Sequence, residues 1–150
     1  MKKMLTVVLS IMAFGIINSA SAADCELVIN STDQMQFDKK ELSVSADCSE
    51  VKLTLNHTGK LAANVMGHNW VLSKTADFQT IAQAGMSAGM DNNYVPQNDP
   101  RVLASSKVIG GGESTTITFS ISALDKGGDY TFFCSFPGHW AIMKGTFKIT

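Results

Sequence analysis

The segment "GDYTFFCSFPGHWAIMKGTFKIT", residues 128–150, contains two strand-like runs joined by a short loop. Polar and apolar residues alternate in "GDYTFF" and again in "MKGTFKIT", as they do in β-strands. The residues between these runs include Pro137 and Gly138, which favour a tight bend over a continuing strand. The segment therefore predicts a strand, a loop and a second strand.

Three side chains with metal-binding chemistry lie in this loop or at its ends. Cys134 is followed after five positions by His139, and after four more by Met143. Thiolate, imidazole and thioether are all soft or borderline ligands. Three residues do not complete a site, so a fourth ligand must come from elsewhere in the fold.

The stretch "VMGHNW", residues 65–70, offers that ligand in His68. Gly67 before it permits a close approach of the backbone, and the side-chain amide of Asn69 after it can form hydrogen bonds that orient the ligands. Ser135 is available for the same supporting role. Because a β-sandwich can bring two strand ends together at one pole, His68 can meet the loop that carries Cys134.

The resulting donor set is two imidazoles, one thiolate and one thioether. Structural zinc sites take cysteine, histidine and carboxylate ligands, and a thioether suits them poorly. Two histidines and one cysteine with a weak axial methionine match a blue-copper electron-transfer site, since sulfur ligands favour Cu(I) and imidazole suits both oxidation states. The donor set therefore favours copper.

Most of the remaining sequence consists of short runs with period-two alternation. Val51, Leu53 and Leu55 alternate with polar residues, and the same alternation recurs at 116–121 and 146–149. The segments between the runs contain "HTGK", "GGGE" and "DKGGD", which are typical of turns. This spacing predicts an all-β, antiparallel sandwich or barrel of Greek-key type.

One segment departs from the strand pattern. In "ADFQTIAQAGMSAGM", residues 76–90, the apolar residues recur at roughly helical intervals. Asp77 stands where an N-terminal cap would help. We therefore expect one short helix inserted between strands.

The N-terminus has the features of an export signal. Two lysines precede an apolar run at residues 4–17, and "ASA" at residues 20–22 supplies the small residues that a signal peptidase needs. The run is too short to span a bilayer as a permanent anchor. Residues 1–22 are thus predicted to be a cleaved signal peptide, which leaves 150 − 22 = 128 residues, enough for one domain in the periplasm.

The charge of the mature chain argues against nucleic acid as a partner. Loss of the two leader lysines leaves 10 basic residues against 13 acidic ones. No lysine or arginine cluster could neutralise a run of phosphates, and no basic amphipathic helix suggests a membrane surface.

Three cysteines in an exported chain allow one disulfide and one remaining thiol. Cys25 and Cys48, near the mature N-terminus, are the natural pair, which leaves Cys134. A free cysteine is a common core residue, so one interpretation of Cys134 is an inert buried thiol. The other is a thiolate ligand, because coordination would hold the sulfur in a non-oxidising role.

The other histidine and the other methionines have simpler interpretations. His57 shares the parity of the apolar residues at 51–55, which predicts a partly buried core histidine rather than a ligand. An isolated methionine usually fills a gap in a core, and this applies to Met35, Met66, Met86 and Met90. Met143 differs from them through its spacing from His139.

Together, "NVMGHNWVLS" and "FFCSFPGHWAIMKGTF" resemble the azurins, a family of bacterial cupredoxins. The resemblance runs through the whole mature chain, including the early cysteine pair, "DQMQF", the inserted helix and the C-terminal strand. It implies that residues 23–150 form one cupredoxin-like Greek-key sandwich of about eight strands, with a Cys25–Cys48 disulfide.

The resemblance also implies a type 1 copper held by His68, Cys134 and His139, with Met143 as a distant axial ligand and the backbone carbonyl of Gly67 on the opposite side. Such a protein carries single electrons by Cu(II)/Cu(I) cycling and is not an enzyme. The expected partners are c-type cytochromes and periplasmic reductases or dehydrogenases. We expect the mature chain to be a monomer without a membrane anchor.

A docking patch around the ring edge of His139 is implied in the same way, because exposed apolar surface marks partner sites. Its expected members are Met35, Leu61, Val65, Met66, Met86, Phe136, Pro137, Gly138, Trp140 and Ile142. Many azurins have a small polar residue directly after the second histidine, whereas this chain has Trp140.

Two other functions could use a similar ligand set. The electron-entry module of a copper reductase or oxidase belongs to an enzyme that needs further histidine-rich copper sites, and this chain has only three histidines. A periplasmic copper carrier or storage protein would favour exposed, exchangeable methionine or cysteine clusters. The HExxH, G-x-S-x-G and phosphate-binding glycine motifs do not occur in the sequence.

Overall fold

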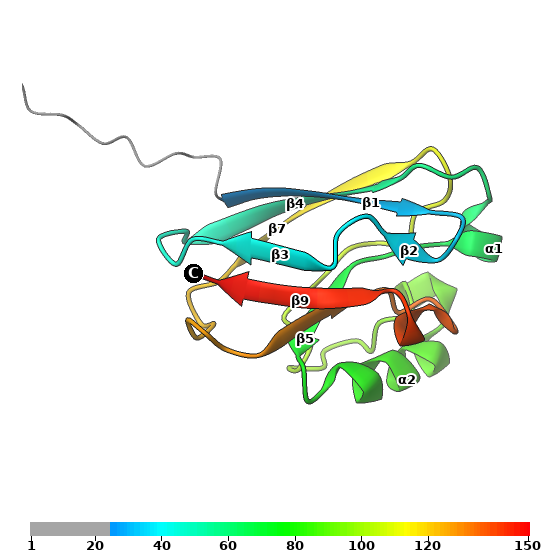
Figure 1. Cartoon of the computed structure of the whole chain (residues 1–150). Coiled ribbons are helices and arrows are strands. Elements are labelled where there is room, and N and C mark those ends of the chain that lie inside the picture. The colour runs from blue at the N-terminus through cyan, green and yellow to red at the C-terminus, as the bar shows by residue number, and fades with distance from the viewer. Residues whose placement is uncertain (1–24) are drawn as a thin grey trace, which may run out of the picture.

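The structure is a computed structural model that describes residues 25–150. Two β-sheets pack face to face, with a helix on the outer face of one of them (Figure 1). The predicted signal peptide at residues 1–22 lies outside the described residues. No helix within residues 25–150 is long and apolar enough to cross a membrane.

The two sheets contain four and five strands. The first has the order β2-β1-β4-β7 and consists of β1 (Glu26–Thr32), β2 (Gln36–Phe37), β4 (Glu50–His57) and β7 (Ser114–Ser120). The second has the order β3-β9-β8-β5-β6 and consists of β3 (Glu41–Val44), β5 (Val71–Lys74), β6 (Ala104–Ser105), β8 (Tyr130–Phe133) and β9 (Lys144–Ile149). The predicted all-β sandwich is confirmed.

The prediction of a purely antiparallel arrangement was wrong for two strand pairs. β1 runs parallel to β4, and β3 runs parallel to β9. Between β1 and β4 the chain passes through β2 and then crosses to the other sheet for β3, so it returns to β1 in the same direction. Turn residues reveal where the chain reverses, but they do not reveal which strands then become neighbours.

The core lies between the sheets. Val51, Leu53 and Leu55 of β4 are fully buried, as their alternation predicts. Trp70, also fully buried, lies in the middle of the aromatic part of this core, with its ring centroid 6.0 Å from that of Phe132. Burial of these side chains provides the main drive for folding.

A second, smaller apolar layer lies under α2 (Phe78–Ala88). Ile81 and Ala82 of this helix pack on Val71 of β5 and Phe133 of β8. All four residues of β8 are therefore buried, on both faces of the sheet, although their sequence alternates like a strand with one wet face. The inserted helix thus supplies the second cover for the strand that leads to Cys134.

Asp77 precedes α2 as expected, but its side chain makes no capping hydrogen bond. Its backbone is helical, with φ −104° and ψ −20°, whereas a capping side chain needs an extended backbone to reach the free N–H groups. The residue contributes its carbonyl oxygen instead, which accepts a hydrogen bond from the N–H of Ile81 at 3.0 Å.

The short helical turns define one end of the sandwich. The turns α1 (Ala63–Met66) and η3 (His139–Ala141) lie at the right-hand end in Figure 1, while the C-terminus and the start of β1 lie at the left-hand end. A further turn, η2 (Met90–Asn92), follows α2. The loop predicted to hold metal ligands therefore lies at the end remote from both ends of the described chain.

The predicted disulfide is present between Cys25 and Cys48, whose Cα atoms are 5.8 Å apart, and Cys134 is free and buried. The bond joins the start of β1 to the turn before β4, across a sequence separation of 23 residues. It limits the freedom of the unfolded chain more than that of the folded one.

We expect the double variant Cys25→Ala/Cys48→Ala to lose about 3 kcal/mol of unfolding free energy, the loop-closure value for a ring of this length. Urea denaturation of the two proteins at one pH measures the difference. A single Cys48→Ala variant would leave an unpaired thiol at Cys25, so the double variant is the cleaner comparison. Equal unfolding midpoints would contradict the expectation.

Candidate metal centre

Three side chains from two distant parts of the sequence meet in a buried cluster. His68 follows α1 and is held by a backbone bridge, in which its N–H donates to Ile109 at 3.0 Å and its carbonyl accepts from Ile109 at 2.9 Å. Cys134 follows β8 directly, and His139 begins the η3 turn. The exposed fractions of the three are 0%, 0% and 4%.

The three donor atoms face one another. The Nδ1 atoms of His68 and His139 are 3.2 Å apart, and the Sγ atom of Cys134 lies 3.8 Å and 3.7 Å from them. Metal bonds to imidazole nitrogen and thiolate sulfur are about 2.0–2.3 Å long, so three donors at these separations can share one small ion. The three donor atoms therefore form a triangle of a size that suits one metal ion.

The tautomer of His68 is set by a backbone carbonyl. Its Nε2 lies 2.8 Å from the carbonyl oxygen of Thr32, which can only accept, so Nε2 carries the proton. The neutral ring then presents the lone pair of Nδ1 to the cluster. This is the usual means by which a protein orients a histidine toward a metal.

Burial keeps both imidazoles in the neutral, metal-binding form. It lowers the pKa of His68 to about 4 and that of His139 also to about 4. Burial has the opposite effect on the thiol and raises the pKa of Cys134 to about 12. Hydrogen bonds from the backbone N–H groups of Asn69 and Phe136 lower this pKa, but their effect is smaller than that of burial. A metal that binds here must therefore displace the thiol proton.

Asn69 joins the two parts of the site. Its Oδ1 accepts a hydrogen bond from the backbone N–H of Ser135 at 2.8 Å, and its Nδ2 donates to the Ser135 hydroxyl at 2.8 Å. The same Nδ2 also donates to the carbonyl of Asn93 at 2.8 Å. The predicted supporting role of Asn69 and Ser135 thus has a defined geometry, which ties the residue after His68 to the residue after Cys134.

The ligand loop is closed by its own backbone. The N–H of Cys134 donates to the carbonyl of Met143 at 3.0 Å, and the N–H of Met143 donates to the carbonyl of His139 at 2.8 Å. Gly138 has φ +82°, so it makes the bend that the sequence predicts there. The side chain of Met143 is fully buried.

Gly67 is required by space rather than by backbone angle. A Cβ atom there would meet the carbonyl oxygen of Ala63 and the side chains of Val108 and Phe136. Its own carbonyl oxygen lies 4.0 Å from the Sγ of Cys134. The close backbone approach expected at Gly67 is therefore present.

His57 is buried next to the cluster without belonging to it. Its ring stacks on that of His68, with centroids 4.5 Å apart. Its Nε2 lies 2.9 Å from the Met66 carbonyl, and its Nδ1 accepts from the N–H of Gly59 at 3.0 Å. Both ring nitrogens are engaged, which agrees with the prediction of a core histidine.

The expected docking patch is only partly at the surface. Six of its members are exposed, namely Leu61, Val65, Met86, Pro137, Gly138 and Ile142, and three are half-buried, namely Met35, Met66 and Trp140. Phe136 is buried, because its ring packs between His139 at 4.6 Å and Tyr94 at 5.2 Å. Its assignment to the exposed patch was wrong, and it forms a wall of the site instead.

Sequence reasoning missed two groups that shape the site, Thr32 and Asn93. Each contributes a backbone carbonyl, one to His68 and the other to Asn69. Any residue type can supply a carbonyl, so the side chain at Thr32 gives no signal of this role. Asn93 has φ +54°, a left-handed conformation that asparagine tolerates better than most residues, and this is a weak signal at best.

A two-sheet β-sandwich with a buried cluster of two histidines and one cysteine at one end defines a type 1 copper protein of the cupredoxin class. The model of the copper-binding proteins of the plastocyanin/azurin family matches residues 23–150. The chain belongs to this family, and the relatives described next place it with the azurins.

The relatives match over most of the chain. Azurin from Bordetella pertussis is 59% identical over 128 residues, which cover 85% of this chain and 85% of the relative. Azurin-1 from Alcaligenes xylosoxydans xylosoxydans is 57% identical over 127 residues, covering 85% and 98%. The solved structure of azurin Az-iso2 from Methylomonas sp. strain J is 45% identical, has a TM-score of 0.81 and covers 84% of this chain and 98% of its own.

Proposed function

We propose that this protein is a periplasmic electron carrier whose copper centre cycles between Cu(II) and Cu(I). The observation that carries the proposal is the buried triangle of His68, Cys134 and His139, with donor separations of 3.2–3.8 Å. Copper, when bound, supplies the one-electron couple. The signal peptide predicted at residues 1–22 supports the periplasmic location.

The three residues of the triangle would hold copper as the strong ligands. The thioether of Met143 and the carbonyl of Gly67 would hold the copper more weakly. Two observations support this assignment: Met143 is buried and bonded through its backbone to both Cys134 and His139, and the Gly67 carbonyl lies 4.0 Å from the thiol sulfur.

The surroundings of the cluster favour fast electron transfer because they hold the ligands still. Thr32 orients His68, Asn69 links the two ligand segments, and the backbone bonds of Met143 close the loop. A cage that keeps its shape in both oxidation states needs little rearrangement when an electron arrives or leaves. This is what an electron carrier requires.

Docking of a redox partner belongs at the end of the sandwich that carries His139. Exposed apolar residues from three segments gather there: Leu61 and Val65 near α1, Met86 on α2, and Ile142 after η3. We propose c-type cytochromes and periplasmic reductases or dehydrogenases as partners of the monomer. Redox partners form some of the smallest protein interfaces, so a limited apolar patch of this kind suits an encounter that ends after one electron has moved.

The chain has no histidine left for a second, catalytic copper site. Two of its three histidines belong to the triangle, and both ring nitrogens of His57 are engaged. This supports a role as carrier rather than enzyme.

Electron exchange tests the proposal directly. Copper-loaded protein mixed with a reduced c-type cytochrome is expected to oxidise it with one electron per copper, while the copper stays bound. Stopped-flow absorbance follows the cytochrome, and metal analysis after gel filtration follows the copper. Zinc-loaded protein is the matched control, since zinc has no redox chemistry. Transfer of copper to the partner without cytochrome oxidation would instead indicate a copper carrier.

A further inference from the structure

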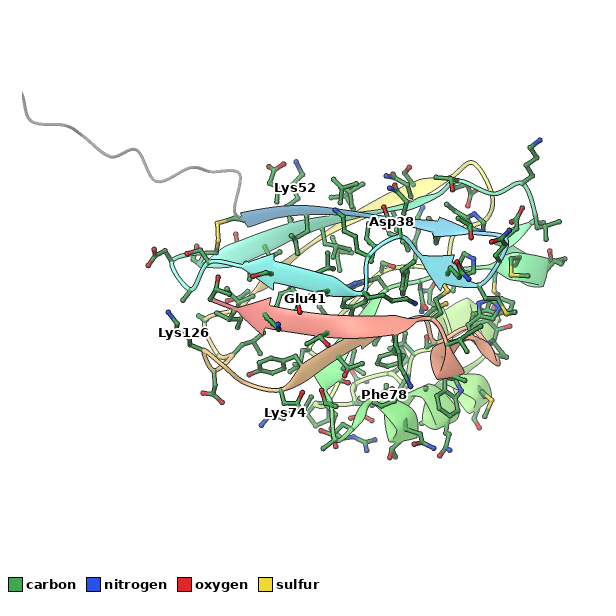
Figure 2. The ribbon with its side chains drawn as sticks, in the orientation of Figure 1. Asp38, Glu41, Lys52, Lys74, Phe78 and Lys126 are labelled. Carbon is green, nitrogen blue, oxygen red and sulfur yellow. A yellow bond between two sulfur atoms is a disulfide. The ribbon has the colours of Figure 1, made fainter. Side chains whose placement is uncertain are left out.

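One side chain outside the ligand set touches the neighbours of all three ligands in the loop. The ring of Phe78, at the start of α2, lies 5.8 Å from the ring of Phe133 and 6.3 Å from that of Trp140. The Nζ of Lys144 lies over the same ring, 4.8 Å from its centroid. Figure 2 labels Phe78 on α2, which passes beneath the η3 turn.

These three contacts have a common relation to the site. Phe133 directly precedes Cys134, Trp140 directly follows His139, and Lys144 directly follows Met143. The two aromatic contacts are edge-on, at interplanar angles of 60° and 65°, the arrangement that ring quadrupoles prefer. The ammonium over the ring face is a cation–π contact. A single ring therefore contacts a residue next to each of the three ligands in the loop.

The support beneath Phe78 is firm. Ile81 and Ala82, one turn further along α2, are fully buried against β5 and β8. A Cβ at Gly85 would meet the backbone of Tyr94, so the helix also lies tight against the segment after it. The helix that carries Phe78 is thus fixed to the sheet.

Part of the ligand loop faces solvent. Pro137, Gly138, Ala141 and Ile142 are all exposed. Trp140 is the member of the η3 turn whose side chain packs back toward α2. This gives a physical reason for a large aromatic residue directly after His139, which the ligand pattern alone does not explain.

We propose that Phe78 is a positioning residue, which sets the spacing of Cys134, His139 and Met143 from outside the metal centre through Phe133, Trp140 and Lys144. That these contacts serve copper binding rests on the proposed function, whereas the contacts themselves do not depend on it. These contacts also give α2 a role: the helix acts as a fixed template for the ligand loop.

Hydrogen exchange in the copper-free protein tests the geometry without any metal. The variant Phe78→Leu keeps an apolar side chain of similar bulk but removes the ring. We expect the amides of Cys134, Ile142 and Met143, which close the loop, to exchange roughly tenfold faster in this variant relative to amides of β4, because the loop opens locally more often once the ring that packs against it is gone. Phe78→Tyr keeps the ring and is expected to behave as the parent.

Phe119→Leu is the matched control. Phe119, on β7, also packs on two aromatic rings, those of Trp70 at 5.6 Å and Phe147 at 6.1 Å, and neither residue adjoins a loop ligand. This variant should lower global stability while it leaves the loop-to-β4 ratio unchanged. A ratio in Phe78→Leu equal to that of the parent would overturn the proposal.

Copper loss provides a second measurement. Transfer of Cu(II) to an excess of chelator should be roughly tenfold faster from Phe78→Leu than from the parent or from Phe119→Leu, within the range known for residues that orient metal ligands. Equal rates in all three would overturn the positioning role. If the parent itself bound no copper, the proposed function would fail, while the exchange experiment would still decide the role of Phe78.

Discussion

Replacement of Cys134 by alanine is expected to abolish the intense blue colour that Cu(II) should give with the folded protein. The colour arises from charge transfer between a thiolate and copper, and Cys134 is the free cysteine of the chain, since the other two form a disulfide. Its sulfur is the donor that faces both imidazoles. With the thiol gone, two nitrogens and weak axial groups remain, and copper bound to them should be nearly colourless.

Visible absorption during titration of apoprotein with Cu(II) measures this effect. The variant Cys25→Ala/Cys48→Ala is the matched control, because it also loses cysteines but keeps Cys134 and should still turn blue. Far-UV circular dichroism establishes that all three proteins are folded. A blue Cys134→Ala variant, or a colourless parent, would contradict the assignment of the metal centre.

The copper-free protein is expected to lose stability as the pH falls from 6.5 to 4. Burial lowers the pKa values of His68 and His139 to about 4, whereas in the unfolded chain they are near 6.5. In this interval the unfolded chain binds protons at both imidazoles and the folded chain does not, so acid favours unfolding. We expect a loss on the order of 5 kcal/mol: a pKa lowered by about 2.5 corresponds to about 3.4 kcal/mol for each group, and about three quarters of it is lost between pH 6.5 and 4.

Urea denaturation of apoprotein at several pH values measures this slope. The variant His139→Gln removes one of the two groups, so it should show a markedly shallower slope. Carboxylates affect a lower interval: hydrogen bonds from Arg101 lower the pKa of Asp99 to about 2, so its contribution disappears only below about pH 4. An apoprotein equally stable at pH 6.5 and pH 4 would contradict the expectation.

The strands and their inward faces were predictable because burial leaves a direct mark on sequence. Val51, Leu53 and Leu55 alternate with polar residues, and all three are buried in β4. The parallel pairing of β1 with β4 was not predictable in this way, since it depends on how the chain crosses between the sheets. The double burial of β8 depends on α2, whose docking site no local pattern reveals.

The metal centre was predictable to the extent that side-chain chemistry defines it. His68, Cys134 and His139 are recognisable as donors, and the structure brings them together. The supports from Thr32 and Asn93 come from backbone carbonyls, which carry no residue signature. Phe78 lies in the segment that the sequence predicts to be helical, but its contacts with the loop arise from tertiary packing and have no local pattern.

The placement of the chain end bears on how the protein could be attached to a surface. Thr150 lies at the end of the sandwich opposite α1 and η3 (Figure 1). An electrode tethered there would be separated from His139 by the length of a strand such as β4, roughly 25 Å for eight residues. Because tunnelling weakens steeply with distance, electron transfer between such an electrode and the metal centre would be slow. The face around His139 would stay open to soluble redox proteins. A linker attached at the exposed Ile142 would instead bring the electrode close to the centre and cover the face proposed for docking of redox proteins.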